Sequence, residues 1–180
     1  MSKDSDILPL FEETVLPHLN VAYNLAHWIM GNEQDAEDMV QEACIRAYQY
    51  FAGYQGGNSR AWLLTIVRNT FYTCLRQNRD QRLNLELDEE LAGGDDPTKD
   101  PETHIQLNSN HLLVRSALEK LPLEYRELIV MRELEEMSYK EIALVSQIPI
   151  GTVMSRLARA RQQLKKYLAN DRDEEGQNEL

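Results

Sequence analysis

The sequence predicts an all-α fold with two small helical domains joined by an acidic flexible linker. Apolar residues recur at helical spacing through most of the 180 residues, and no segment shows convincing strand alternation. Residues 84–104 break this pattern, because they are acidic, contain two prolines and a glycine pair, and have few apolar residues after Leu91. We therefore predict domains over 1–82 and 109–169, a linker over 83–108 and an acidic tail over 170–180.

Three helices are expected in the first domain. Apolar spacing predicts them over about 8–30, 33–52 and 60–79. Gly31-Asn32 ends the first helix, and residues 53–59 (GYQGGNS) form a flexible loop before the third because three of them are glycine. Cys44 and Cys74, the only cysteines, fall within apolar helical patterns, so we expect buried free thiols there.

The second domain is predicted to begin with helices over about 105–120 and 123–134 and to end with a pair of helices. Ser138 and Glu141 match a capping box that opens the first helix of the pair. Pro149 and Gly151 then break that helix. Thr152 is expected to cap the last helix, whose outer side is rich in Arg and Lys.

A short helix, a tight turn and a basic second helix are typical of a helix-turn-helix, which we predict over 138–168. In this motif the second helix lies in the major groove of duplex DNA. Its first residues reach base edges, and later cations contact phosphates. An ordinary solvated basic helix is the alternative, but a nearly all-basic outer face in so acidic a chain argues against it.

The charge distribution supports nucleic-acid binding even though the formal net charge is −11 at pH 7. Five arginines lie within residues 51–82 beside one acidic residue, and six basic residues lie within 137–169, again beside one acidic residue. Acidic residues dominate the remaining sequence. Because clustered cations steer a polyanion to particular surfaces, the sequence predicts two separate basic patches.

Aromatic residues and cations alternate along the third predicted helix. Unstacked bases can lie on aromatic rings while guanidinium groups hold the phosphate backbone, so this mixture suits single-stranded nucleic acid. The glycine-rich loop just before this helix has room for a flipped nucleotide. The alternative is that Trp62 and Phe71 belong to the core, which is at least as plausible for Phe71.

The second predicted helix carries a polar patch opposite its apolar face. Asp38, Gln41 and Glu42 are spaced at i, i+3 and i+4, so they share one helix surface. Such a patch is usually only a solvated face. Acid–base catalysis is a poor alternative, because no histidine, serine or metal ligand lies nearby in the sequence.

Three segments, in this order, resemble the extracytoplasmic-function (ECF, group 4) sigma factors of the sigma-70 family of bacterial RNA polymerase. They are DAEDMVQEACIRAY, RAWLLTIVRN and LPLEYRELIVMRELEEMSYKEIALVSQIPIGTVMSRLARARQQL. They look like the family's polymerase-binding helix, its −10-element helix and its whole σ4 domain. The resemblance covers roughly 8–80 and 110–168. It implies a σ2-like first domain, a σ4-like second domain, and promoter-specific initiation with core RNA polymerase at −10 and −35 elements.

The resemblance also implies a role for each polar surface. The β′ clamp helices of core polymerase are expected to contact Asp35, Asp38, Gln41, Glu42 and Arg46. The non-template strand of the −10 element is expected at Tyr54, Asn58, Ser59, Arg60, Trp62, Arg68, Asn69, Tyr72 and Arg76. The −35 duplex is expected at Thr152, Met154, Ser155, Arg156, Ala158, Arg159, Arg161 and Lys165. The β flap is a further expected polymerase contact, and the linker is expected to pass through the RNA exit channel.

Two positions depart from the family's usual pattern. Met154 stands where the family usually has Lys or Arg, which predicts a different −35 preference, such as an apolar contact with a thymine methyl. Gln147 stands where the turn often has Gly, so we expect an adjusted or strained backbone there. No segment corresponds to the extra σ3 domain or the acidic N-terminal region of housekeeping sigma factors.

Other functional classes make different predictions. A stand-alone helix-turn-helix regulator would bind an operator alone and carry an effector or dimerisation domain. A sigma mimic that sequesters an anti-sigma factor would have lost the cations of its recognition helix, which are present here. An enzyme is the least favoured, because the four histidines are scattered and none pairs with a nucleophile or ligand set.

The same observations set expectations about cofactors and location. We expect no catalytic residue, no metal or other cofactor and no small-molecule substrate. With no secretory signal or membrane span in the sequence, we expect a cytoplasmic protein, nucleoid-associated in the holoenzyme. The resemblance adds an anti-sigma factor as an expected partner.

Overall fold

The computed structural model describes residues 4–88 and 109–178, and every regular element within them is helical. This confirms the predicted all-α class. The predicted linker beyond Asp88 and the last two residues of the predicted tail lie outside the described residues. The first unit contains α1 (Asp4–Val15), η1 (Leu16–His18), α2 (Leu19–Met30), α3 (Glu33–Tyr50), η2 (Phe51–Gly53) and α4 (Ser59–Asp88). The second contains α5 (Ser109–Glu119), α6 (Leu123–Ile129), the π-helical turn η3 (Val130–Leu134), α7 (Tyr139–Ser146) and α8 (Ile150–Asn178).

Several predicted helix boundaries were wrong, including the end of the last helix, since α8 continues through the predicted tail to Asn178. The helix expected over 8–30 is divided by η1, where Pro17 lacks the N–H that a continuous α-helix needs. Helix α4 continues beyond residue 79 to Asp88, into the predicted linker, since the segment NLELD lacks Gly and Pro to stop it. Helix α8 begins at Ile150, so Thr152 lies in its first turn and is not its cap.

Small residues allow the first unit to pack closely. Ala22 and Ala26 of α2 and Ala36, Ala43 and Ala47 of α3 are all buried, so these two helices approach along a seam of alanines. From α4, the buried residues Leu63, Leu64, Val67 and Phe71 complete this core. Cys44 and Cys74 are free but only half-buried, which corrects the prediction of buried thiols.

The buried residues of the second unit join those of the first in one hydrophobic cluster. The second unit contributes Leu118, Leu128, Met131, Met137, Ile142, Val145, Val153, Leu157 and Ala160, all nearly or fully inaccessible to solvent. The π-helical turn at the end of α6 buries Val130 and Met131 and then redirects the chain toward α7. This core holds α6, α7 and α8 in a fixed relation, which positions the helix-turn-helix.

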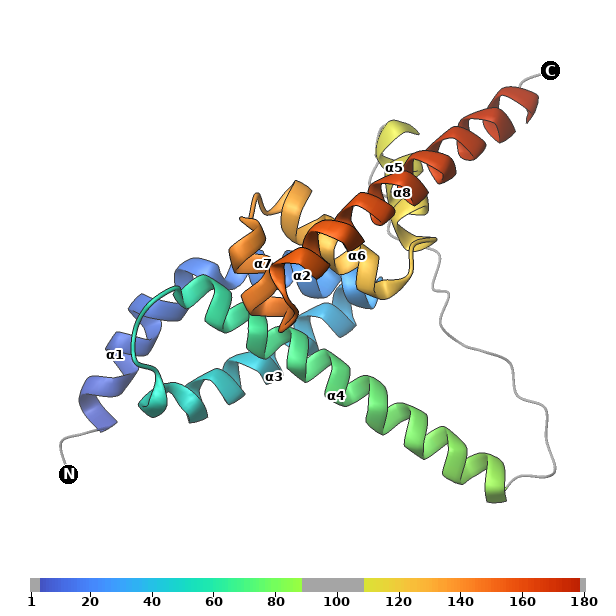
Figure 1. Ribbon diagram of the computed structural model, residues 1–180. Helices are drawn as coiled ribbons and strands as arrows, with labels where there is room; N and C mark the ends of the chain where they lie inside the picture. The colour runs from blue at the N-terminus through green and yellow to red at the C-terminus, as the bar shows by residue number, and fades with distance from the viewer. Residues whose placement is uncertain (1–3, 89–108, 179–180) are drawn as a thin grey trace.

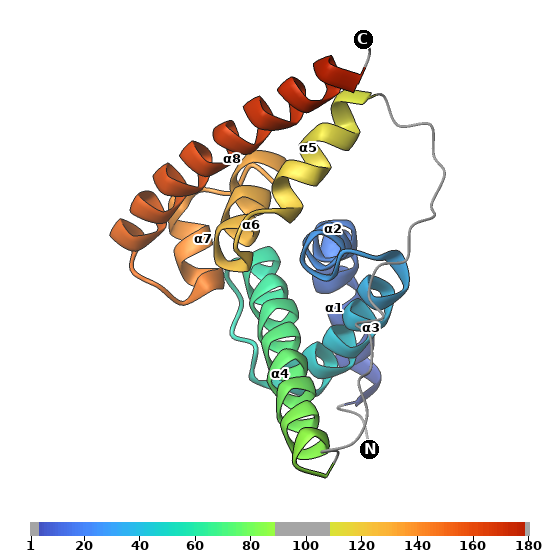
Figure 2. The ribbon, with the colours of Figure 1, turned by 90° about the vertical axis from the view of Figure 1, so that its right-hand side faces the viewer.

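The two units pack against one another. Helix α7 lies beside the N-terminal half of α4, and α6 lies beside α2 (Figures 1 and 2). The C-terminal parts of α4 and α8 extend away from these contacts (Figure 1). The predicted nucleic-acid surface of α4 is therefore close to the second unit.

Candidate nucleic-acid interface

The predicted capping box is present at the start of α7. Ser138 Oγ accepts a hydrogen bond from the Glu141 N–H at 3.2 Å, and Glu141 Oε2 accepts one from the Ser138 N–H at 2.8 Å. The backbone hydrogen bond from Ser138 and the one from the Asn58 side chain lower the pKa of Glu141. The carboxylate therefore stays charged at the N-terminus of α7, where the helix dipole favours it.

The turn between α7 and α8 has the unusual backbone that the sequence predicts. Gln147 adopts a left-handed conformation with φ 56° and ψ 39° and ends α7. The Pro149 carbonyl then accepts hydrogen bonds from the N–H groups of Thr152 and Val153, at 2.9 and 3.1 Å. These bonds start α8 two residues before the predicted cap.

Helix α8 presents the predicted base-reading residues to solvent. Val153, Leu157 and Ala160 are buried against the second unit. On the opposite side, Met154 is 52% exposed and Ser155, Ala158 and Arg159 are also exposed. Thr152 is half-buried, and its carbonyl accepts a hydrogen bond from the Ser155 hydroxyl at 3.1 Å.

Two of the predicted −35 cations are paired within the second unit. Arg156 lies 3.1 Å from Glu124, and Arg161 donates two hydrogen bonds to one oxygen of Glu133, at 2.9 and 2.6 Å. The hydrogen bond to Glu133 raises the pKa of Arg161. Among the described residues, Arg159 has no ion-pair or hydrogen-bond partner, which leaves its guanidinium available to a base.

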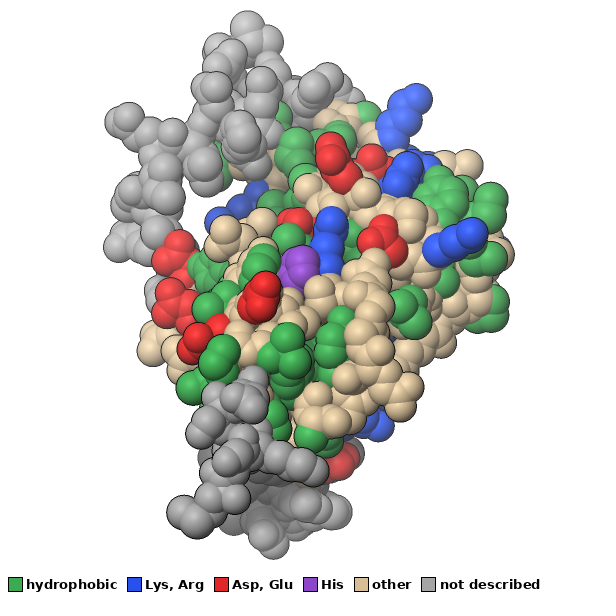
Figure 3. Space-filling view, turned by 90° about the vertical axis from the view of Figure 1, so that its left-hand side faces the viewer, with side chains coloured by type: hydrophobic (Ala, Val, Ile, Leu, Met, Phe, Trp, Pro, Cys, Tyr) green, Lys and Arg blue, Asp and Glu red, His purple; other side chains and the backbone are tan. Residues whose placement is uncertain are grey.

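A groove lies beside the later cations of α8. It has a volume of about 530 Å³ and lies between α6 and α8, with Lys165 at its edge and Ile129, Leu164 and Leu168 along its walls. Lys and Arg side chains on the face shown in Figure 3 are interspersed with acidic and apolar ones. The basic segments of the sequence therefore do not form one continuous positive surface on this side of the molecule.

The predicted polymerase-binding residues lie on the outer side of α3. Asn32 caps this helix by accepting a hydrogen bond from the Asp35 N–H at 2.8 Å, and its amide donates to the Asp35 carboxylate. Asp35, Asp38 and Gln41 are exposed, while Glu42 and Arg46 form an ion pair at 2.7 Å. The patch is accessible and polar, opposite the alanine seam.

The loop before α4 encloses an aromatic cavity. Gly56 and Gly57 have φ values of 86° and 99°, which favour glycine, and the Tyr54 hydroxyl donates to the Gly57 carbonyl at 3.1 Å. The Tyr54 and Trp62 rings lie 4.8 Å apart, centre to centre. A cavity of about 410 Å³ opens beside them. Leu144 and Gln147 of the second unit form part of its wall.

Along α4, several predicted strand-binding residues contact the second unit. Arg68 donates two hydrogen bonds to Glu127, at 3.0 and 2.8 Å, and the Tyr72 hydroxyl donates to the same carboxylate at 3.3 Å. Arg60 donates to the Glu135 carbonyl, while Arg60 Nε is buried without a hydrogen-bond partner in the described part of the chain. Glu127 is a partner of this surface that the sequence patterns did not single out. A carboxylate directly before the apolar run LIVM was the available signal, because a buried carboxylate needs a partner.

The remaining predicted −10 residues differ in their exposure and in their contacts within the first unit. Asn58 caps α4 by accepting from the Ala61 N–H at 2.9 Å, and Ser59 Oγ lies 2.9 Å from His18 Nε2. Burial and then the Arg60 charge lower the pKa of His18. Asn69 is exposed, and so is Arg76, whose Nε donates to the Tyr72 carbonyl at 3.3 Å. Trp62 is half-buried, whereas Phe71 is buried in the core.

The described residues contain neither a candidate metal site nor a helix suited to cross a membrane. Among residues 7–80 and 112–170, whose side chains the structure describes, no cluster of three His, Cys, Asp or Glu side chains could hold a metal ion. No helix in those ranges is long and apolar enough to cross a membrane.

Comparison with known proteins identifies relatives of both units. Residues 14–81 match the family described as Sigma-70 region 2, and residues 111–164 match Sigma-70, region 4. The chain is 35% identical to the ECF RNA polymerase sigma factor SigE of Mycolicibacterium smegmatis, over 97% of this chain and 67% of that protein. It is 33% identical to the RNA polymerase sigma-H factor of Pseudomonas aeruginosa, over 88% of this chain and 86% of that protein.

Solved structures share the arrangement of helices. The sigma factor RpoE, solved with the anti-sigma factor NepR from Bartonella quintana, matches with a TM-score of 0.69 and 28% identity, over 88% of this chain and 96% of that chain. CnrH, solved with the cytosolic domain of CnrY, matches with a TM-score of 0.61 and 28% identity, over 89% of this chain and 88% of that chain. Both similarities span the two helical units.

Proposed function

This chain belongs to the ECF sigma factors of the sigma-70 family, and on that premise we propose how its helices divide the work of promoter recognition. It binds core RNA polymerase and directs promoter-specific transcription initiation. A stand-alone regulator is not favoured, because the first unit matches Sigma-70 region 2 over residues 14–81. We propose that the chain has no catalytic activity of its own, since the polymerase performs the chemistry.

Helix α8 is the proposed reader of the −35 duplex. The observation that carries this assignment is the exposed face of Met154, Ser155, Ala158 and Arg159 at the N-terminal end of a helix-turn-helix recognition helix. Arg159, without a partner in the described residues, is suited to a bidentate contact with guanine. The proposed phosphate contacts are Thr152, Arg156, Arg161 and Lys165.

The loop before α4 and the face of that helix that carries Arg68 and Tyr72 are the proposed site of the −10 strand. Tyr54 and Trp62 provide aromatic surface beside a cavity of about 410 Å³, where an extruded base can be held. Arg68, Tyr72 and Arg76 extend this surface along α4. Base stacking on aromatic residues stabilises single strands by about 1–3 kcal/mol per base, which favours strand opening.

Three protein contacts complete the proposal. The exposed patch of Asp35, Asp38, Gln41, Glu42 and Arg46 binds the β′ clamp helices, and the second unit contacts the β flap. The solved relatives RpoE and CnrH support the proposal that an anti-sigma factor, or a comparable protein domain, captures this chain. The acidic linker is proposed to pass through the RNA exit channel, with the holoenzyme in the cytoplasm on the nucleoid.

In vitro transcription tests the proposal as a whole. Purified core polymerase and the full chain are incubated with a random promoter library, and the initiating sequences are recovered. The expected result is initiation from templates that share −10 and −35 elements. If the chain neither binds core polymerase nor directs initiation from any template, the proposed function is wrong.

A double variant on α3 tests the polymerase contact. Asp38→Arg with Gln41→Ala replaces a carboxylate of the patch with a cation, which cancels the patch's net negative charge, and is expected to reduce core binding by at least tenfold in a pull-down or anisotropy titration. Gln49→Ala, also at an exposed position on α3, is the matched control and is expected to bind normally. Unchanged core binding by the double variant, with a normal helical circular dichroism spectrum, contradicts this assignment.

A further inference from the structure

The second helical unit covers the face of α4 that we propose captures the −10 strand. Three side chains of that proposed site, Asn58, Arg60 and Arg68, donate hydrogen bonds to the second unit. Their acceptors are the Glu141 carboxylate, the Glu135 carbonyl and the Glu127 carboxylate. Cations and amides suited to DNA are therefore bound to oxygen atoms of the same chain.

The Glu127 cluster is the most buried of these contacts. The side chain of Glu127 is 1% exposed and that of Arg68 is 15% exposed, and the two meet in a bidentate ion pair. The Arg68 guanidinium also lies 4.5 Å from the centre of the Tyr72 ring. Burial and the Glu127 charge raise the pKa of Tyr72 to about 12, so its hydroxyl stays protonated and donates to Glu127.

The contacts near the loop before α4 also hold the second unit against the proposed −10 site. Asn58 Nδ2 donates to Glu141 at 2.8 Å, which ties the start of α4 to the capping box of α7. Leu144 and Gln147 form part of the wall of the cavity beside Tyr54 and Trp62. A DNA strand that followed α4 into this cavity would meet α7.

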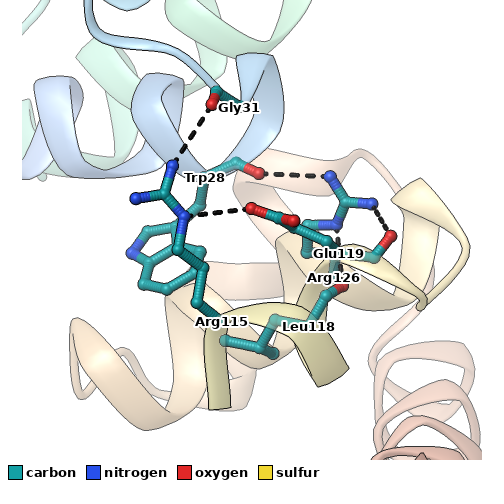
Figure 4. A network of polar contacts seen from close by, with 6 residues as sticks. All are labelled: Trp28, Gly31, Arg115, Leu118, Glu119 and Arg126. Carbon is teal, nitrogen blue, oxygen red and sulfur yellow. Dashed lines mark hydrogen bonds and ion pairs between the residues drawn. The ribbon is translucent and has the colours of Figure 1, made fainter. Parts of the chain in front are cut away.

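A second set of contacts between the units lies around the end of α2 (Figure 4). Arg126 donates to the Trp28 carbonyl at 3.4 Å and also to carbonyls of its own unit, including that of Leu118 at 2.9 Å. Arg115 donates to the Gly31 carbonyl at 3.3 Å and pairs with Glu119 at 3.0 Å. Closure therefore uses two separated sets of contacts, which resist rotation of one unit on the other.

We propose that the free sigma factor is closed on itself, with Glu127 occupying the Arg68–Tyr72 site in place of a promoter phosphate. Arg68 cannot make its bidentate contact with Glu127 and with DNA at the same time. Asp38 and Gln41 stay exposed in this form, so core polymerase can bind α3 first and the units separate afterwards. The consequence for promoter binding rests on the proposed function, whereas closure itself does not.

Charge reversal at Glu127, whose ion pair with Arg68 joins the two units, tests closure directly. Cys44 and Cys74 are replaced by Ala, and donor and acceptor dyes are attached to cysteines placed at the exposed positions Gln77 and Gln162. Single-molecule energy transfer then reports the distance between α4 and α8 in the free full chain. Glu127→Lys is expected to reduce the closed-to-open ratio on the order of 100-fold, because it leaves Arg68 beside another cation.

Two further variants distinguish loss of the Arg68–Glu127 ion pair from a general loss of structure. The swap Arg68→Glu with Glu127→Arg restores opposite charges and is expected to restore the closed distance. Glu133→Lys breaks the ion pair with Arg161 inside the second unit and is expected to leave that distance unchanged. Helical circular dichroism verifies that each variant is folded. The closed distance in the wild type, and its rescue by the swap, remain informative even if Glu127→Lys does not fold.

The outcomes distinguish closure from the proposed −10 site. An open wild-type protein, or a folded Glu127→Lys variant that stays closed, overturns the proposed closure. Addition of core polymerase is expected to convert the closed distance to an open one, and retention of the closed distance in the holoenzyme overturns the opening step. If the swap variant closes normally and transcribes as well as the wild type, closure stands and Arg68 has no role in strand capture.

Discussion

The outer face of α8 and the strand-binding face of α4 use similar residues but are occupied differently. On α8, Arg156 and Arg161 pair with acids of their own unit, and Arg159 between them has no partner among the described residues. On α4, Arg68 pairs with an acid of the other unit. Under the proposed function, the α8 surface binds DNA without a change in domain arrangement, whereas the α4 surface requires the units to separate. The comparison therefore predicts that ion pairs within a unit are compatible with DNA binding, and that ion pairs between the units control it.

The largest expected effect is a loss of stability that distinguishes a core aromatic residue of α4, Phe71, from an aromatic residue of the proposed site, Trp62. Phe71 is 8% exposed and packs in the first unit, so Phe71→Ala is expected to lower the free energy of unfolding by about 3–5 kcal/mol. Trp62 is half-buried beside the cavity, so Trp62→Ala is expected to impair promoter opening with a smaller loss of stability. Urea denaturation and permanganate footprinting of holoenzyme complexes measure the two effects. Equal losses of stability would place Trp62 in the core.

The second prediction concerns Arg159, an arginine of α8 that has no partner among the described residues. Arg159→Ala is expected to weaken binding to a cognate −35 duplex by about 1–3 kcal/mol, the usual range for a specific base contact. Arg156→Ala is the matched comparison, since Arg156 already pairs with Glu124, and a smaller loss that is uniform across sequences is expected. Competition binding with promoter and scrambled duplexes gives both values. If Arg159→Ala loses no more affinity than Arg156→Ala, Arg159 is not the principal base contact.

Local features of the sequence predicted individual helices and caps well, but the contacts between the two units depend on distant residues. The capping box, the helix-turn-helix and the polar face of α3 follow from spacing within one or two helical turns, and the structure contains each of them. The bond between Arg68 and Glu127 joins residues 59 positions apart. Such a pair leaves no periodic signal, because helical spacing relates only near neighbours.

Helix ends were predicted less well, for separate physical reasons. A single proline at position 17 divides a helix that its apolar stripe predicts to be continuous. Helix α8 begins at Ile150 because the Pro149 carbonyl accepts two N–H groups, so the preference of Thr152 for a cap position does not decide the boundary. Local propensity is a weak guide where neighbouring backbone groups supply the hydrogen bonds.

The smallest expected effect lies at Gln147, where the turn of the helix-turn-helix meets the loop before α4. A left-handed backbone costs an L-residue about 1–2 kcal/mol, a cost that glycine avoids. Part of this gain is lost because glycine also increases the conformational entropy of the unfolded chain. Gln147→Gly is therefore expected to raise the free energy of unfolding of the second unit by about 0.5–1 kcal/mol. Gln147→Asn, which tolerates the same conformation, is expected to fall between the two. Urea denaturation followed by circular dichroism measures the order.

The Gln147→Gly variant also tests which contacts keep the two units closed. Gln147 is part of the wall of the Tyr54–Trp62 cavity, so glycine removes a side chain from the contact between α7 and the loop. If closure depends on the Glu127 and Glu141 contacts, Gln147→Gly raises stability while the distance between α4 and α8 stays closed. A variant that is more stable but open would assign closure to packing in that cavity and not to the buried ion pair.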